Sequence, residues 1–167
     1  MFYIGSCALT RRYHWDRKVN DIDIVGSMDE VTRYVNCIRG PLHRAYPVND
    51  GRKWIYRKGD WWIEAEITWP GSTAEELAQY VASDLVANAP HLDVLLMLKM
   101  SHRYKRNSPH FLKTMKDIRM MRSLGAAMRP DFMDWFQRRE AETYDYAHPN
   151  LNQSKEGFFD GSVIYPP

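Results

Sequence analysis

Apolar and polar residues recur with clear periods along most of the chain, and these periods predict strands first and helices later. The apolar run at 2–4, "FYI", predicts a short strand that ends at Gly5, because glycine permits the backbone angles of a tight turn. The segment "DIDIVG" at 21–26 alternates with period two and predicts a second strand. Apolar residues three and four apart predict a helix over 29–40. The chain therefore opens with two predicted strands and one helix.

A tryptophan-rich hairpin is predicted over 53–71, after a stretch at 41–51 that is expected to be irregular. Its two runs are joined by Lys58-Gly59-Asp60. On the second run, one face carries apolar residues, and the other carries Glu64 and Glu66. The hairpin thus adds two strands, of which the second presents a pair of carboxylates.

The second half of the chain shows mainly helical periods. Helices are predicted over 72–85, 91–104, 108–125 and about 130–144, and the tail at 148–167 is rich in turn-forming residues. Strands followed by helices predict an α+β domain, with a small mixed sheet and a helical C-terminal half.

Length and composition narrow the class of protein. The 167 residues predict a single domain, with a sheet core over 1–70, a helical part over 71–147 and the tail. A hydrophobic fraction of 44% and a net charge of only +2 indicate a globular chain without an overall basic field. The longest apolar run, "VLLML", is too short to cross a bilayer, so we expect a cytoplasmic protein without a membrane partner. Cys7 and Cys37 lack a metal or disulfide pattern and are expected to be idle thiols.

Asp21 and Asp23 are the first candidates for chemistry. Two residues apart on a strand, they lie on one face about 6 to 7 Å apart along the chain. Carboxylates this close raise each other's pKa unless a cation neutralises them. A hard divalent cation such as Mg²⁺ (or Mn²⁺) prefers such oxygen ligands. A two-metal site usually requires a third carboxylate, for which Glu64 and Glu66 both remain candidates and Glu64 is favoured.

Phosphate ligands are expected next to these acids. The Gly5-Ser6 turn offers backbone N–H groups and a hydroxyl, and Arg11 and Arg12 follow it along the chain. A second basic region lies much further on and is expected to hold a triphosphate or an RNA backbone. Its candidate residues are Lys99, His102, Lys113 and Lys116. The alternative for this region is a solvated helix surface on which Lys113 pairs with Asp117.

The order of "YIGS", "DIDI" and "WIEAEI" resembles the nucleotidyltransferase superfamily, which shares the fold of the catalytic domain of DNA polymerase β. Its members carry a hydrophobic-Gly-Ser turn, a DxD strand and a third carboxylate on a later strand. The resemblance covers residues 2–68, and the matching positions are Ser6, Asp21, Asp23 and Glu64 or Glu66. The chain is most similar to phage-borne and bacterial nucleotidyltransferase-like proteins, through "IGSCAL", "KMSHRY", "HFLKTMKDIRMM" and "HPNLNQSKEGFF".

This resemblance implies an enzyme that transfers a nucleoside monophosphate from a nucleoside triphosphate to a hydroxyl acceptor, which is a tRNA-like RNA, a protein or a small molecule. Asp21, Asp23 and Glu64 would hold two Mg²⁺ ions, and Gly5-Ser6 would cradle the triphosphate. Two alternatives remain open. One is a catalytically reduced binding or regulatory module of the same fold, and the other is a divalent-metal nuclease that uses the same acids.

Overall fold

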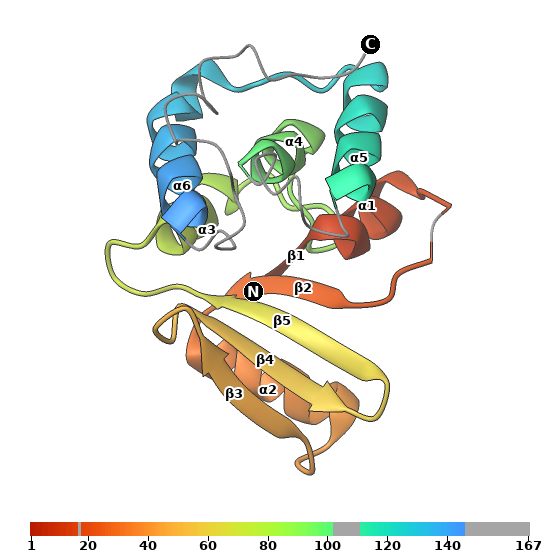
Figure 1. Cartoon of the computed structure of the whole chain (residues 1–167), viewed down its shortest axis with the longest axis vertical. Coiled ribbons are helices and arrows are strands. Elements are labelled where there is room, and N and C mark those ends of the chain that lie inside the picture. Colours follow the sequence, from red (N-terminus) through yellow and green to blue (C-terminus); the bar gives the residue numbers. More distant parts are fainter. Residues whose placement is uncertain (17, 102–110, 146–167) are drawn as a thin grey trace. The chain divides into compact units, whose positions relative to one another are not determined.

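The computed structural model describes residues 1–16, 18–101 and 111–145, and for residues 111, 112, 144 and 145 it describes the backbone only. The chain forms two compact units, Met1–Leu95 and Leu96–Pro167. A mixed sheet followed by a helical C-terminal half confirms the predicted α+β class (Figure 1). The single domain expected from the length stays a prediction, because compactness does not show whether the two units unfold together.

The first unit is built on a five-stranded sheet with the strand order β1-β2-β5-β4-β3. Strands β2 and β5 are parallel neighbours, whereas the other neighbouring strands are antiparallel. The crossover between β2 and β5 therefore brings the two predicted acidic strands side by side. The elements are β1 (Phe2–Ile4), α1 (Gly5–Tyr13), β2 (Ile22–Gly26), α2 (Met28–Arg39), β3 (Arg44–Val48), β4 (Lys53–Lys58), β5 (Trp61–Ile67) and α3 (Thr73–Val81).

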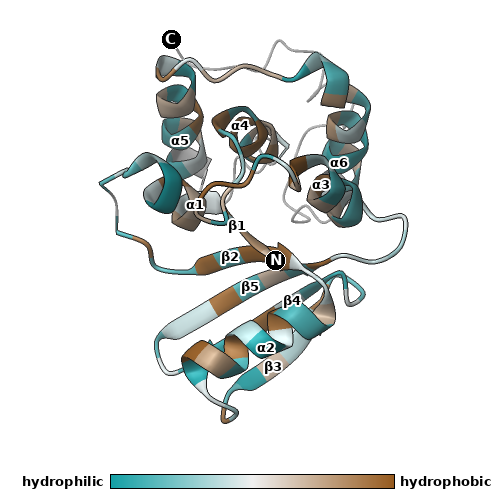
Figure 2. Cartoon of the chain, turned by 180° about the vertical axis from the view of Figure 1, so that it is seen from behind, coloured by the Kyte–Doolittle hydropathy of each residue, from teal (hydrophilic) through white to brown (hydrophobic). Residues whose placement is uncertain are grey.

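Helix α2 covers one face of the sheet, as the view from behind shows for β3 and β4 (Figure 2). The Tyr56 hydroxyl of β4 donates a hydrogen bond to the sulfur of Met28 in α2, at 3.6 Å. Ile63 and Ala65 of β5 lie on this same face and are almost completely buried. Side chains alternate between the two faces of a strand, so Glu64 and Glu66 point to the opposite face. The predicted hairpin and its two faces are confirmed.

Strand β3 was not expected, because the stretch at 41–51 was predicted to be irregular. Its residues are Arg-Ala-Tyr-Pro-Val, and four of the five are exposed. Burial on one face normally produces the alternation that identifies a strand, and an exposed edge strand lacks it. Pro47 is compatible with a strand here because β3 lies at the sheet edge, where a missing N–H need not break the ladder.

Helix α4 (Leu92–Met100) begins in the first unit and ends in the second. The second unit continues with α5 (Phe111–Ser123), the 3-10 turn η1 (Pro130–Phe132) and α6 (Met133–Asp145). These helices agree with the predicted periods, whereas the 148–167 tail lies outside the described residues. In the second unit, the side chains of Ile118, Met121 and Trp135 are almost fully buried. Across the described parts of the chain, no helix is long and apolar enough to cross a membrane.

Candidate metal centre

Three carboxylates predicted from the sequence meet on the sheet face that α2 does not cover. Asp23 of β2 lies directly beside Glu64 of β5 in the parallel register, and Asp21 immediately precedes β2. Each of Asp21, Asp23 and Glu64 offers a carboxylate oxygen, and these oxygens lie within 4.8 Å of one another. All three residues are half-buried. The structure thus brings together the two aspartates and the favoured third acid.

The spacing and chemistry of this cluster fit a hard divalent cation. Oxygen ligands about 2.1 Å from one Mg²⁺ lie about 3 to 4 Å from each other, so the three oxygens need only small movements to converge. The set contains carboxylates alone, without the thiolate or imidazole groups that softer metals select. Three neighbouring negative charges also repel one another unless a cation compensates them. Asp21, Asp23 and Glu64 are therefore the residues that would hold Mg²⁺ or Mn²⁺.

Gly5 connects the predicted Gly-Ser turn to this cluster. It begins helix α1 with a backbone φ of +62°, in the left-handed region that favours glycine. A Cβ atom placed on Gly5 would lie 2.2 Å from the Oδ2 atom of Asp23, which is closer than atoms can approach. The neighbouring residue Ile4 pairs with Asp23 across strands β1 and β2. Glycine is therefore required both by the turn and by the carboxylate packed against it.

Ser6 lies in the first turn of α1 and is buried, with 4% of its surface exposed. Its backbone carbonyl accepts a hydrogen bond from the Thr10 hydroxyl at 3.1 Å. Residue Ile4, at the N-cap position, supplies no side-chain cap to the helix. The N–H groups at a helix N-terminus are suited to bind a phosphate.

Lys53 is the residue of the site that sequence reasoning missed. Its ammonium forms an ion pair with the Glu64 carboxylate, and each side chain is 27% exposed. Burial lowers the pKa of Lys53, but the nearby carboxylates of Glu64, Glu66 and Asp23 outweigh burial and raise it above its usual value. The hairpin sequence could have identified Lys53. A two-residue turn at Gly59-Asp60 pairs Lys53 with Glu66 and therefore places Lys53 on the same face as the glutamates.

Glu66, the other candidate for the third carboxylate, lies further along β5. It is 9% exposed and stands between Val25 of β2 and Lys53 of β4 in the sheet register. The three-carboxylate cluster contains Glu64, two residues earlier. Glu66 thus contributes negative charge near the Lys53 ammonium from a more buried position.

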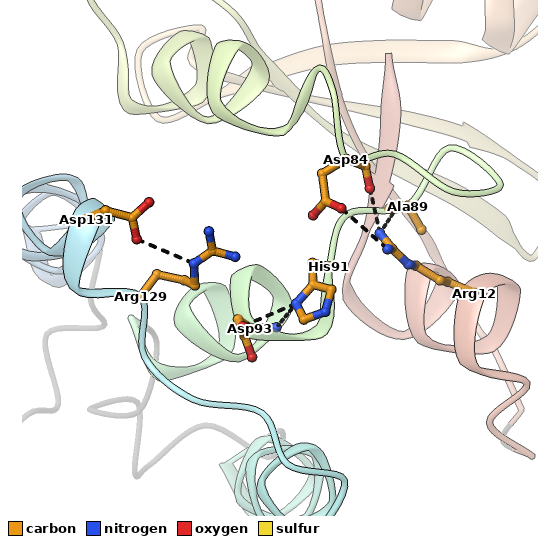
Figure 3. Close-up of polar contacts among 7 residues, drawn as sticks. All are labelled: Arg12, Asp84, Ala89, His91, Asp93, Arg129 and Asp131. Atoms are coloured by element: carbon orange, nitrogen blue, oxygen red, sulfur yellow. Dashed lines mark hydrogen bonds and ion pairs between the residues drawn. The ribbon is translucent and has the colours of Figure 1, made fainter.

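The two predicted arginines of α1 differ in their surroundings. Arg12 donates hydrogen bonds to the backbone carbonyls of Asp84 and Ala89, at 2.7 and 2.9 Å, and its other terminal nitrogen lies 3.6 Å from the Asp84 carboxylate (Figure 3). Arg12 therefore ties α1 to the loop after α3. Arg11 is exposed, and its guanidinium lies 4.2 Å from the centre of the Tyr3 ring. Of the two, Arg11 is the one that solvent and ligands can reach.

The remaining predicted nucleotide ligands lie in the second unit. Lys99 forms an ion pair with the fully buried Asp117 at 3.2 Å, and the pairing of Lys113 with Asp117 stays a prediction. Lys113 is half-buried and Lys116 is exposed on α5, while His102 lies outside the described residues. The ion pair gives Lys99 a structural role within its own unit.

Cys7 lies in α1 beside the acidic cluster and is buried, whereas Cys37 is exposed. Burial raises the pKa of the Cys7 thiol, Arg11 lowers it, and the charges of Asp23 and Asp21 raise it further. The net increase keeps the thiol protonated at neutral pH, where it is neither a nucleophile nor a metal ligand.

Comparison with known proteins yields two matches to family models. Residues 1–81 match a domain of unknown function (DUF7277), and residues 94–166 match a second domain of unknown function (DUF7275). No curated protein and no solved structure matches the chain. The candidate metal centre, including Gly5 and Lys53, lies entirely within the first matched range.

Proposed function

We propose that the chain is a metal-dependent nucleotidyltransferase. The observation that carries this proposal is the convergence of the Asp21, Asp23 and Glu64 oxygens within 4.8 Å, next to a helix N-terminus whose first residue must be glycine. Acids and phosphate-binding N–H groups on one side of a sheet suit a nucleoside triphosphate with its divalent ions. The cytoplasm supplies both the nucleoside triphosphate and the divalent ions, so we propose a cytoplasmic location. For a viral protein this would be the cytoplasm of the host cell.

The proposed reaction is the transfer of a nucleoside monophosphate. An acceptor hydroxyl oxygen forms a bond to the α-phosphorus, the bond from that phosphorus to the leaving oxygen breaks, and pyrophosphate departs while the hydroxyl proton passes to water. Bound Mg²⁺ ions would neutralise the charge that develops on the phosphate oxygens. Asp21, Asp23 and Glu64 would hold the ions, and the N-terminus of α1 would orient the triphosphate. Positioning and charge neutralisation supply most of the rate increase.

The test compares nucleotide binding by the wild type and by Asp21→Asn/Asp23→Asn, using calorimetry with Mg²⁺ and each of the four triphosphates. Asp50→Asn/Asp60→Asn is the matched control, since it removes two exposed carboxylates from turns of the same unit. We expect the first variant to lose binding and the control to retain it. Equal binding by both variants would refute the proposal.

Transfer is then measured with α-labelled triphosphates and a pool of cellular RNA and protein. Label on an acceptor, lost in Asp21→Asn/Asp23→Asn, supports the enzyme. Nucleotide binding without transfer to any acceptor supports the catalytically reduced module instead.

The pairing of Lys53 with Glu64 favours the nuclease as a second candidate. Metal-dependent nucleases use a lysine beside their strand acids, and the residue two positions after Glu64 is a glutamate rather than a lysine. Lys53 supplies that ammonium from the neighbouring strand. Cleavage of a labelled nucleic acid with Mg²⁺, in the absence of any triphosphate, would support this candidate over the transferase.

A further inference from the structure

We infer that the uncovered sheet face beside the acidic cluster binds a single-stranded nucleic acid, which is the acceptor in the proposed transfer. This inference rests on the proposed function and identifies its substrate class. Figure 1 shows α2 behind β3 and β4, with no helix of the first unit in front of these strands. The open face, as we call it, consists of Arg44, Tyr46, Ile55, Arg57 and Trp62.

The sheet register connects the open face directly to the acids. Tyr46 of β3 pairs with Ile55 of β4, Ile55 pairs with Glu64 of β5, and Glu64 pairs with Asp23 of β2. Paired residues of adjacent strands share a face, so this row runs from an exposed tyrosine to the metal-binding acids. Neighbouring strands are about 4.8 Å apart, and the row therefore extends about 14 Å from its acidic end. A polymer held on the open face would reach the acids with its end.

The second row of the open face has a charge arrangement that stability does not explain. Arg44 lies directly opposite Arg57, which in turn lies opposite Trp62. Like charges directly opposite each other on neighbouring strands are destabilising. Both arginines are exposed, and neither has a carboxylate partner among the residues that the structure describes. An anion placed between them would turn this repulsion into attraction.

Aromatic groups accompany these charges. Tyr46 is 42% exposed, Trp62 is half-buried, and the Arg57 guanidinium lies 6.0 Å from the centre of the Trp62 ring. Arginines that contact phosphates beside aromatic rings that stack on bases are the usual composition of surfaces for single strands. Unpaired bases are available for stacking, whereas the bases of a duplex are already stacked on each other. The open face is therefore suited to a single strand more than to a duplex or to an acidic protein.

The experiment measures binding of fluorescent oligouridylate and oligodeoxythymidylate by anisotropy, with the full chain in EDTA and without triphosphate. We expect Arg44→Glu/Arg57→Glu to weaken binding about tenfold or more and to reduce its salt dependence, because phosphate contacts are lost. Tyr46→Ala should weaken binding about fivefold, since one stacking contact is lost. The RNA and DNA arms show which sugar is preferred, and binding of neither overturns the inference.

The matched control is Arg33→Glu/Lys58→Glu, which makes the same change of charge at exposed residues on α2 and on the α2 side of the sheet. Equal affinities for this control and for Arg44→Glu/Arg57→Glu would overturn the inference, as would competition by a duplex as strong as that by a single strand. Circular dichroism of each variant confirms that it is folded. Since no metal or triphosphate is present, failure here leaves the tests of the proposed function unaffected.

Discussion

At the scale of single residues, the site depends on two contacts to its acids. Gly5 approaches the Asp23 carboxylate so closely that no side chain fits between them, and Lys53 pairs with Glu64. The first contact is steric and the second is electrostatic. Substitution of Gly5 should therefore displace a carboxylate, whereas substitution of Lys53 should remove its compensating charge. Neither substitution removes a carboxylate.

For Gly5→Ala we expect weaker Mn²⁺ binding and lower stability. The left-handed backbone costs alanine about 1 to 2 kcal/mol, and the added methyl group must also displace the Asp23 carboxylate. Gly59→Ala is the matched control, since Gly59 has a φ of +59° and open space around it. The Gly59→Ala variant should lose stability through the left-handed backbone alone, and it should keep the Mn²⁺ affinity of the wild type. Calorimetric titration and chemical denaturation measure both quantities, and an equal loss of Mn²⁺ affinity in the two variants contradicts the steric contact.

Lys53→Met removes the positive charge that compensates the acids. We expect the free energy of unfolding without divalent ions to fall by about 1 to 3 kcal/mol, between the effects typical of exposed and of buried ion pairs. Mn²⁺ should then raise the melting temperature more than it does in the wild type, because no ammonium competes with it for Glu64. The control is Lys58→Met, at an exposed position on the same strand and the other face. An unchanged Mn²⁺ response in Lys53→Met would show that the lysine does not compete with metal.

At the scale of elements, helix α1 has two tasks, which its two ends perform. Its N-terminus faces Asp23, and Arg12 in its last turn holds the loop at 84–89 through two carbonyls and a carboxylate. Arg11, next to it, is exposed to solvent. Adjacent arginines in one helix therefore serve different purposes, which their order in the sequence does not reveal.

Arg12→Met should destabilise the protein by about 2 kcal/mol or more, because two backbone carbonyls lose a charged donor. Arg11→Met loses only a contact with the Tyr3 ring, worth up to about 1 kcal/mol. The effects on nucleotide affinity should show the reverse order. We expect affinity to fall in Arg11→Met and to remain unchanged in folded Arg12→Met. Thermal unfolding and nucleotide titration measure the two effects, and reversed results would assign the nucleotide contact to Arg12.

The elements also show what the sequence could and could not predict. Hairpin β4–β5 was predictable because one face is buried and its residues alternate, and the same alternation placed Glu64 on the other face. Strand β3 was missed because an exposed edge strand leaves no such pattern. Lys53 was missed because its partner is eleven residues away along the chain, and only the hairpin register makes them neighbours.

At the scale of the whole molecule, the predicted site residues fall into two groups. The three acids of the cluster, Gly5 and Lys53 belong to the first unit, which also contains the open face, whereas Lys99, Lys113 and Lys116 belong to the second. The high density of basic residues in this part of the sequence suggests that the second group binds phosphate. The sequence alone does not show whether a given lysine binds a ligand or forms an ion pair with another residue of the protein. Lys99 illustrates this, since its partner Asp117 is completely buried. The acids and the N-terminus of α1 belong to the first unit, and phosphate binding by the basic residues of the second unit stays a prediction.

The close approach of Gly5 to Asp23 also has an evolutionary consequence. Among related sequences, the two positions should not vary independently. A lineage that keeps a carboxylate at position 23 has to keep glycine at position 5, and drift at position 5 becomes tolerable only after that carboxylate is gone. Even then, the left-handed backbone would favour asparagine over alanine there. A residue other than glycine at position 5 would thus indicate, in any relative, that the carboxylate at position 23 has been lost.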